Sequence, residues 1–331
     1  MNLVAKWIIG LCAGTLIIAV TSPLFVRSYL PQQFDATRGT RVLSAHKHYR
    51  WRSEGYATTL IGEHGMPGRP NIGVVADNGF RIALWGDSQA EGVCVEDGKK
   101  LFAQMENAGD DQHKMTVLPF ARSGDSARDW LHQFPHVESN VGVDGHAILI
   151  CEISDLLSAA NLPTQTAPAN TNDFELVKYV PAFVIQSARN VLTDASGRHR
   201  RLRFGIGPIP RSQIDRVRAG PVDWTPIVTA IAQATEKPLF VIYAPKSPQI
   251  GFGKIDLIDE GYAEFKRFEQ AAEAAGVIVI DVSDALGGSA KDGVWPHGFH
   301  NGRFGSGHLN EAGYQVIAQQ AVPVIAEAMR P

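Results

Sequence analysis

The stretch FRIALWGDSQ, residues 80–89, joins a short apolar run to a glycine and then to a polar turn. The run 80–85 has the length and composition of a buried strand, and Gly86 permits the tight turn that ends it. Ser88 is therefore expected at the carboxyl end of a strand, near the start of the next helix. There its backbone N–H could help to hold an oxyanion.

The same alternation continues along the chain. Four further apolar runs are predicted as strands, at 115–120, 146–151, 238–245 and 276–282. Helical patterns occupy 99–108, 262–275 and the stretch from Asn310 onward, where Pro323 is expected to kink or end the first part of the last helix. Strands that alternate with helices predict a doubly wound parallel α/β sheet, in which ligands bind at the carboxyl ends of the strands.

Composition narrows the classes of function. The 331 residues carry a formal net charge of -3, which excludes a general nucleic-acid binder because such proteins show a strong basic excess. Cys12 lies in an apolar run, and the remaining two cysteines, Cys94 and Cys151, favour buried free thiols over a disulfide framework.

Residues 7–26 read WIIGLCAGTLIIAVTSPLFV, twenty residues without a charge, which is long enough to cross a bilayer. Pro23 follows the one small-residue stretch that could serve as a cleavage site, so segment 1–26 is interpreted as an uncleaved anchor rather than a signal peptide. Four basic residues follow the run: Arg27, Arg38, Arg41 and Lys47. The positive-inside rule places them in the cytoplasm, whereas an apolar run at the start of the chain is typical of exported bacterial proteins. We favour a single-pass inner-membrane protein with a periplasmic domain.

Three further segments complete the organisation. Residues 27–78 are predicted as a stalk and irregular N-terminal extension, and 79–331 as the folded domain. An insertion at 157–222 interrupts the alternation and holds a predicted helix at 181–192. It also holds a basic patch at 198–203, interpreted as a solvated face, with contact to an anionic glycan or lipid head groups as the alternative.

A serine hydroxyl needs a base to act as a nucleophile. Of the eleven histidines, His308 is the best placed, because it lies in GSGHLNEAGY (305–314), a glycine-rich loop before the last helix, which Asn310 is expected to cap. The alternative is a histidine that only packs against that helix. A metal cluster of His297, His300 and His308 is not favoured, because no acidic or thiol partner has ligand-like spacing. No phosphate or dinucleotide loop is found, so no cofactor is predicted.

The motifs that follow the predicted strands, taken in order along the chain, resemble the sequence blocks of the SGNH/GDSL hydrolase family over about residues 78–331. Gly86-Asp87-Ser88 is similar to its first block, the stretch 123–126 (SGDS) to its second, and the loop at His308 to its last. The resemblance implies a flavodoxin-like three-layer α/β/α sandwich with a five-stranded parallel sheet. It also implies that Ser88 is the nucleophile, that His308 is the base, and that the N–H groups of Ser88 and Gly124 hold the oxyanion.

Two blocks depart from the family pattern. After the third predicted strand, Glu152 replaces a glycine, and Ser154 replaces the asparagine that would donate to the oxyanion. Ser154 can donate through its shorter hydroxyl. Gly305 stands where the family has the acid that orients the histidine. The substitutes considered are the carbonyl of Gly305, a Ser–His dyad without an orienting group, or an acid from Asp281, Asp284 and Asp292.

The resemblance implies acyl transfer at a serine, without metal or cofactor. The predicted function is a membrane-anchored esterase acting on an acyl group, acetyl by preference, of a cell-envelope or secreted polysaccharide. Its partners would be an acylated carbohydrate or another small ester, and the lipid bilayer through 7–26. Two alternatives remain: an O-acetyltransferase using the same site, and an inactive fold that binds a glycan or a membrane partner, which Glu152 and Gly305 favour.

Overall fold

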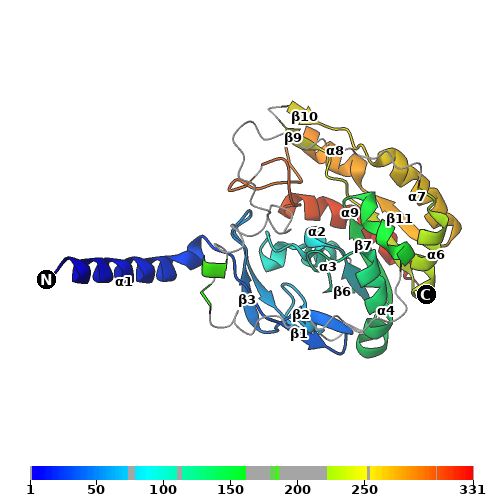
Figure 1. Ribbon diagram of the computed structural model, residues 1–331. Coiled ribbons are helices and arrows are strands. Elements are labelled where there is room, and N and C mark those ends of the chain that lie inside the picture. The colour runs from blue at the N-terminus through cyan, green and yellow to red at the C-terminus, as the bar shows by residue number, and fades with distance from the viewer. Residues whose placement is uncertain are drawn as a thin grey trace.

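The computed structural model describes residues 2–73, 79–109, 114–161, 180–181, 183–185, 222–251, 254–302 and 304–330. Its centre is a sheet of five strands: β5 (Phe80–Trp85), β6 (Met115–Pro119), β7 (Gly145–Ile150), β8 (Leu239–Tyr243) and β11 (Ile278–Asp281). The strand order is β6-β5-β7-β8-β11, and every neighbouring pair is parallel. This is the flavodoxin-like order, so the predicted fold class is confirmed (Figure 1).

Helices cover both faces of this sheet. One face packs against α3 (Leu101–Ala108), α8 (Ser283–Lys291) and α9 (Glu311–Ala328), and the other against α4 (Ala127–Val141), α6 (Thr225–Gln233) and α7 (Tyr262–Ala274). Within β5, Ile82 and Leu84 belong to the first core, and Ala83 and Trp85 to the second. Because consecutive side chains of a strand point to opposite faces, a strand buried on both sides reads as a continuous apolar run.

The last helix differs from its prediction in one respect. Asn310 caps α9 as expected, and its side chain accepts a 3.1 Å hydrogen bond from the Gly313 N–H. The helix does not end at Pro323 but continues to Ala328. Val322 and Ile325, on either side of the proline, are buried in the core, so burial of this face offsets the lost backbone hydrogen bond.

The N-terminal extension is more ordered than its polar sequence indicated. Residues 27–73 contain two antiparallel hairpins, β1 (Gln32–Asp35) with β2 (Thr40–Leu43), and β3 (Lys47–Arg50) with β4 (Thr58–Ile61). The prediction of an irregular stalk is therefore corrected. Strands of four residues are too short for an alternating pattern to stand out from a polar background.

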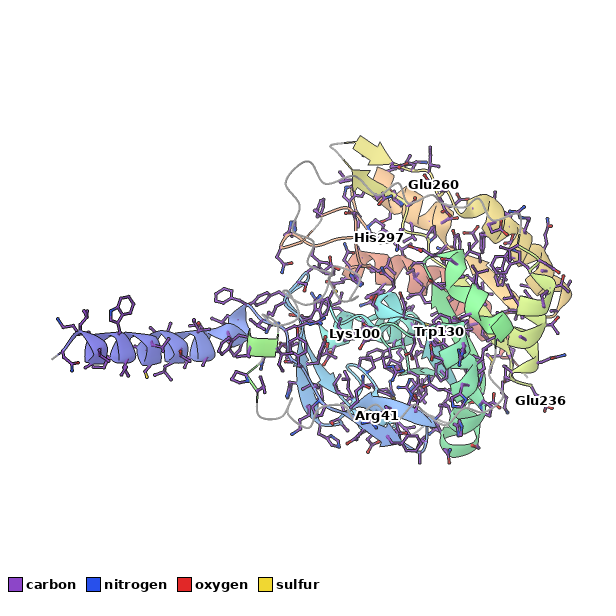
Figure 2. The ribbon with its side chains drawn as sticks, in the orientation of Figure 1. Arg41, Lys100, Trp130, Glu236, Glu260 and His297 are labelled. Atoms are coloured by element: carbon purple, nitrogen blue, oxygen red, sulfur yellow. The ribbon has the colours of Figure 1, made fainter. Side chains whose placement is uncertain are left out.

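Two buried cations connect these hairpins to the rest of the molecule. Arg38 is 1% exposed and donates hydrogen bonds to Gln133 Oε1 (2.8 Å), the His64 carbonyl (3.1 Å) and the Phe120 carbonyl (2.5 Å). Burial lowers its pKa to about 10. Lys100, which is labelled in Figure 2, is also 1% exposed. Its ammonium group donates to Thr59 Oγ1 in β4 at 3.0 Å, and burial lowers its pKa to about 8. Both cations donate chiefly to uncharged oxygens. Each hydrogen bond therefore depends on the position of one particular oxygen, which fixes the hairpins relative to the sheet.

The N-terminal helix α1 (Leu3–Thr21) projects away from the rest of the molecule (Figure 1) and buries none of its residues. Together with the turn that follows, it makes a segment, Leu3–Leu24, long and apolar enough to cross a membrane. An anchor and a signal sequence both meet that criterion. The basic patch at 198–203 and most of the insertion lie outside the described residues, as does the predicted helix at 181–192 except for 181 and 183–185. Cys94 and Cys151 are buried free thiols, as predicted.

We predict that Arg38→Ala lowers the free energy of unfolding by about 2–4 kcal/mol, because it leaves several buried acceptors without a donor. Chemical denaturation followed by circular dichroism measures the change. Arg128→Ala, at an exposed position of α4, is the matched control and should change stability by less than about 0.5 kcal/mol. Equal stability of the two variants would contradict a structural role for the buried guanidinium.

Candidate active site

Ser88 is the first residue of the short helix α2 (Ser88–Glu91), directly beyond β5. Gly86 makes the turn with φ 147°, and a Cβ there would lie 2.6 Å from Ala90 Cβ and 2.8 Å from the Leu149 carbonyl oxygen. Only glycine fits so close a contact. The Asp87 side chain then caps α2 by accepting a 2.8 Å hydrogen bond from the Gln89 N–H. The sequence GDS thus fixes the serine at the carboxyl edge of the sheet.

His308 lies against this serine. Its Nε2 is 3.0 Å from Ser88 Oγ, although the two residues are 220 positions apart in the chain. The histidine loop is held in place on both sides, because the His308 carbonyl accepts from Gly298 N–H at 2.8 Å and the Leu309 N–H donates to Gln89 Oε1 at 2.9 Å. The 3.0 Å distance between His308 Nε2 and Ser88 Oγ is within the range needed for a base to take a proton from a serine hydroxyl.

The other ring nitrogen of His308 contacts Glu54. Nδ1 is hydrogen-bonded to Glu54 Oε1, and Glu54 lies in the loop between β3 and β4. Burial alone would raise the pKa of this carboxyl, but the hydrogen bonds and charge of His308 outweigh it and lower the pKa below its usual value. An ionised carboxylate at Nδ1 fixes the imidazole tautomer and stabilises its protonated form. Ser88, His308 and Glu54 therefore have the geometry of a catalytic triad.

The structure corrects the prediction of the orienting group. Asp281 accepts hydrogen bonds from the backbone and hydroxyl of Ser283, and Asp284 and Asp292 lie at the first turn and the C-cap of α8. The carbonyl of Gly305 accepts a 2.6 Å hydrogen bond from the Ile250 N–H. The alternative of a Ser–His dyad without an orienting group does not hold either, because Glu54 is hydrogen-bonded to His308 Nδ1.

Glycines of the histidine loop make room for Glu54. A Cβ at Gly302 would lie 2.7 Å from Glu54 Cβ, and a Cβ at Gly307 would lie 3.0 Å from Glu54 Oε2. The Gly55 N–H donates a 2.9 Å hydrogen bond to Asn301 Oδ1. The glycines were the one sequence signal that another group packs against the histidine loop, because a loop with few side chains leaves space for a residue from elsewhere in the chain. Nothing in the sequence indicated which group.

The loop that carries Glu54 is also attached to the end of the N-terminal helix. Arg52 Nε donates to the Pro23 carbonyl at 3.2 Å, and its guanidinium carbon lies 4.2 Å from the Tyr56 ring centroid. The Tyr56 hydroxyl donates to the Leu24 carbonyl. The residues directly after the apolar helix thus support the loop that places Glu54.

The predicted oxyanion donors lie at the same edge of the sheet, beyond β6 and β7. Gly124 has φ 85°, and a Cβ built there would meet no atom within 4 Å, so the space beside it is open. The Ser154 hydroxyl donates a 3.4 Å hydrogen bond to Glu152 Oε2, and Glu152 is ion-paired with Lys246. The Ser154 hydroxyl is thus engaged by Glu152, and the role of the Gly124 N–H as an oxyanion donor stays a prediction.

Glu54, His308 and Cys94 bring possible metal-ligating atoms within 4.8 Å of one another. Both nitrogens of His308 are already hydrogen-bonded to Ser88 and Glu54. Burial raises the pKa of the Cys94 thiol, which disfavours the thiolate that a metal requires. Among the described residues, His297 lies outside this cluster: its Nε2 faces the Pro245 carbonyl at 3.2 Å, and burial lowers its pKa to about 4. The arrangement fits a hydroxyl nucleophile and its base better than a metal centre.

The parallel sheet places Ser88 beyond its first strand, and His308 directly precedes its last helix. The strand order and the place of Ser88 are those of the flavodoxin-like doubly wound fold. No family model and no curated protein matches this chain.

Among solved structures, three similar ones come from bacteria or a metagenome. An α/β hydrolase from the Lake Arreo metagenome has a TM-score of 0.39 at 14% identity, covering 78% of this chain and 99% of its own. A mutant of an acetyl xylan esterase from Geobacillus stearothermophilus has 0.39 at 12% identity, covering 74% and 94%. A G-D-S-L family lipolytic protein from Desulfitobacterium hafniense has 0.35 at 13% identity, covering 74% and 99%. Such low TM-scores assign no activity, so the site residues themselves decide the chemistry.

We predict that Glu54→Gln lowers kcat/KM for p-nitrophenyl acetate by about 10²–10⁴-fold, because an amide does not stabilise a protonated imidazole. The acid limb of the pH profile of kcat/KM should move to lower pH, since removal of the negative charge disfavours protonation of the ring. Glu63→Gln, at an exposed position of the same extension, is the control and should behave as wild type. Full activity of Glu54→Gln would remove Glu54 from the triad.

We further predict that Arg52→Ala lowers kcat/KM by about ten- to a hundredfold, because the loop carrying Glu54 loses its attachment to Pro23. The acid limb of the pH profile should move as it does in Glu54→Gln, which a general loss of stability would not cause. Tyr56→Phe, which removes the hydrogen bond to Leu24, should show a weaker form of the same shift. Lys47→Ala, exposed on β3, serves as the control. An unchanged pH profile in both loop variants would show that Glu54 is positioned without this attachment.

Proposed function

We propose that this protein is a serine esterase that cleaves an acyl ester. The observation that carries the proposal is the continuous hydrogen-bonded chain from Glu54 through His308 to Ser88. Nucleophile, base and orienting acid come from three distant parts of the sequence and meet at the carboxyl edge of the sheet, where ligands of doubly wound proteins bind.

The geometry supports a two-step mechanism. His308 Nε2 takes the proton of the Ser88 hydroxyl as Oγ attacks the ester carbonyl, while Glu54 stabilises the imidazolium. The N–H groups of Ser88 and Gly124 hold the negative charge that develops on the carbonyl oxygen. His308 then gives its proton to the departing alcohol, leaving an acyl group on Ser88. A water molecule, deprotonated by the same nitrogen, releases the acid and restores the serine.

The finer parts of the proposal concern substrate and place. The resemblance to the family implies an acetyl ester on a cell-envelope or secreted polysaccharide. The exposed apolar segment Leu3–Leu24 supports attachment to a membrane, with the catalytic domain on the periplasmic side. Since residues 23 and 24 contact the loop that carries Glu54, we propose that the segment is retained and that the site works close to the bilayer.

The alternative of an inactive binding fold loses its main support. It depended on Gly305 standing in place of the triad acid, and Glu54 supplies that acid from the N-terminal extension. Glu152, the other departure, is exposed, ion-paired with Lys246 and hydrogen-bonded to the Ser154 hydroxyl. It therefore affects one predicted oxyanion donor but leaves the contact between Ser88 and His308 in place.

We predict that a fluorophosphonate probe labels the wild-type protein and that Ser88→Ala abolishes both labelling and hydrolysis of p-nitrophenyl acetate. Removal of a nucleophile that acts with its base typically costs about 10⁶-fold in kcat. Ser139→Ala, at an exposed position of α4, is the control and should keep both properties. Labelling that persists in folded Ser88→Ala, or a folded wild type that neither labels nor hydrolyses the ester, would refute the esterase.

A further inference from the structure

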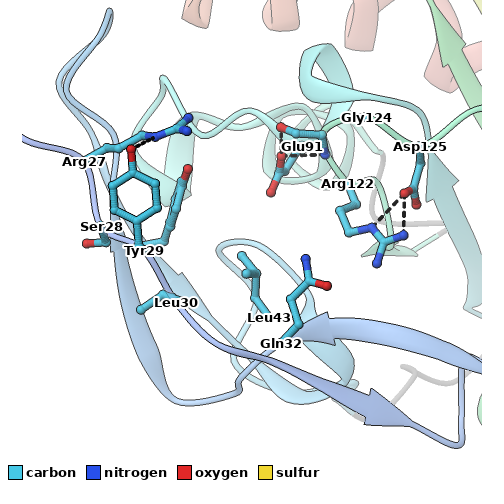
Figure 3. Close-up of a pocket in the computed structure, with 12 residues that line it drawn as sticks. Arg27, Ser28, Tyr29, Leu30, Gln32, Leu43, Glu91, Arg122, Gly124 and Asp125 are labelled. Atoms are coloured by element: carbon cyan, nitrogen blue, oxygen red, sulfur yellow. Dashed lines mark hydrogen bonds and ion pairs between the residues drawn. The ribbon is translucent and has the colours of Figure 1, made fainter. Parts of the chain in front are cut away.

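A second feature of the molecule is a cavity of about 430 Å³ between the N-terminal extension and the loop after β6 (Figure 3). One wall comes from the segment after α1 and from the hairpins, including Arg27, Tyr29 and Gln32. The opposite wall comes from Glu91 and from the loop 122–125. The volume lies within the range of about 300–1,000 Å³ usual for small-molecule sites.

The cavity adjoins the reacting centre. Gly124, whose N–H is assigned to the oxyanion, lies in its wall. Glu91 is three residues after Ser88 in α2, and residues at that spacing lie on neighbouring positions of one helix face. A molecule in the cavity would therefore lie next to an ester that reacts at Ser88.

The charges that line the cavity are balanced. Arg122 forms two contacts to Asp125 Oδ1, at 2.7 Å from Nε and 2.6 Å from Nη2. Glu91 Oε2 accepts from the Ser123 N–H at 2.8 Å and from the Ser123 hydroxyl. Two carboxylates thus stand among two guanidinium groups, an arrangement that gives an anion no net attraction.

One acceptor in this wall is not satisfied. Asp125 Oδ2 is buried and has no hydrogen-bond partner among the described residues, and Asp125 as a whole is 8% exposed. This oxygen is itself closed to solvent, so the polar groups that a molecule in the cavity can contact belong to other lining side chains, among them Gln32 and Tyr29.

Aromatic rings complete the lining. Tyr29 and Tyr49 both face the cavity, and Arg27 Nε donates to the Tyr29 hydroxyl at 3.2 Å. The Arg27 guanidinium carbon lies 5.0 Å from the Tyr29 ring centroid. Donors and acceptors stand close together beside flat apolar rings. Such a lining suits a neutral polyhydroxylated ring, which offers hydroxyls around its edge and C–H groups on its faces.

We propose that this cavity is a subsite for a neutral sugar unit that neighbours the esterified sugar of a polysaccharide substrate. The proposal depends on the esterase function and adds a specificity element to it: the N-terminal hairpins bind the polymer, and the sheet domain cleaves its ester. A small ester without a sugar gains nothing from these contacts, so the cavity affects the two kinds of substrate differently.

The test varies Gln32, whose position on β1 lines the cavity, and uses Gln33 as its matched control, because consecutive strand residues face opposite sides. The substrates are p-nitrophenyl acetate and partially O-acetylated oligosaccharides of glucose, xylose and N-acetylglucosamine, assayed with the full-length protein in detergent. We expect Gln32→Ala to lower the ratio of kcat/KM on the best oligosaccharide to that on p-nitrophenyl acetate about five- to tenfold, as for the loss of one hydrogen bond. Gln32→Trp should lower it further by filling the cavity, and Gln33→Ala should leave it unchanged.

A binding measurement separates this proposal from the esterase itself. Unacetylated oligosaccharides of the same sugars are titrated calorimetrically into Ser88→Ala and into the double variant with Gln32→Trp. Binding to the first protein and weaker binding to the second supports the subsite even where no ester is cleaved. Equal kcat/KM ratios for the Gln32 and Gln33 variants, or tighter binding of a polyuronate than of any neutral oligosaccharide, would overturn it. Failure of the wild type to hydrolyse p-nitrophenyl acetate would refute the esterase alone.

Discussion

The contact between Glu54 and His308 is the interaction on which the rest of the site depends. An imidazole beside a serine can adopt either tautomer and can rotate, and a carboxylate on Nδ1 removes both freedoms. Here that carboxylate comes from a hairpin loop 254 residues away in the chain. The loop must approach closely, and the glycines at 302 and 307 permit this because any side chain there would displace Glu54. The composition of the histidine loop is thus explained by a partner outside it.

The hairpins need a rigid attachment if they are to deliver a catalytic group. Arg38 and Lys100 provide it from opposite sides: Arg38 extends from the hairpins to α4 and to the loop after β6, and Lys100 extends from the sheet domain to β4. Both cations are buried and hydrogen-bonded to several oxygens, which makes displacement costly because each oxygen would be left without a donor. The extension is for this reason held rigidly against the sheet domain and contributes Glu54 to the proposed active site.

The same arrangement brings the end of the apolar N-terminal segment into contact with the loop that carries Glu54. Pro23 and Leu24 accept hydrogen bonds from the loop of Glu54, and Arg27 and Tyr29 line the cavity beside Gly124. A few residues after the apolar helix therefore contribute both to the orientation of the base and to the proposed sugar subsite. The length of this connection is constrained, because an inserted or deleted residue would shift the carbonyls that Arg52 and Tyr56 require.

The sequence alone determined the elements whose signals are local. A strand buried on both faces must be apolar throughout, so FRIALW and its four counterparts could be located, and their alternation with helices predicted the parallel sheet. The GDS turn and the glycine-rich loop before Asn310 placed Ser88 and His308 at the correct ends of their elements.

Only the tertiary structure decided which acid completes the site and what the polar N-terminal stretch does. The hairpins have four-residue strands whose stability comes from contacts with the sheet domain, so no local periodicity reveals them. Glu54 has no distinguishing neighbour in the sequence, and its role arises because two loops far apart in the chain are folded against each other. A carboxylate acts on an imidazole through distance and direction in space, which separation along the chain does not encode.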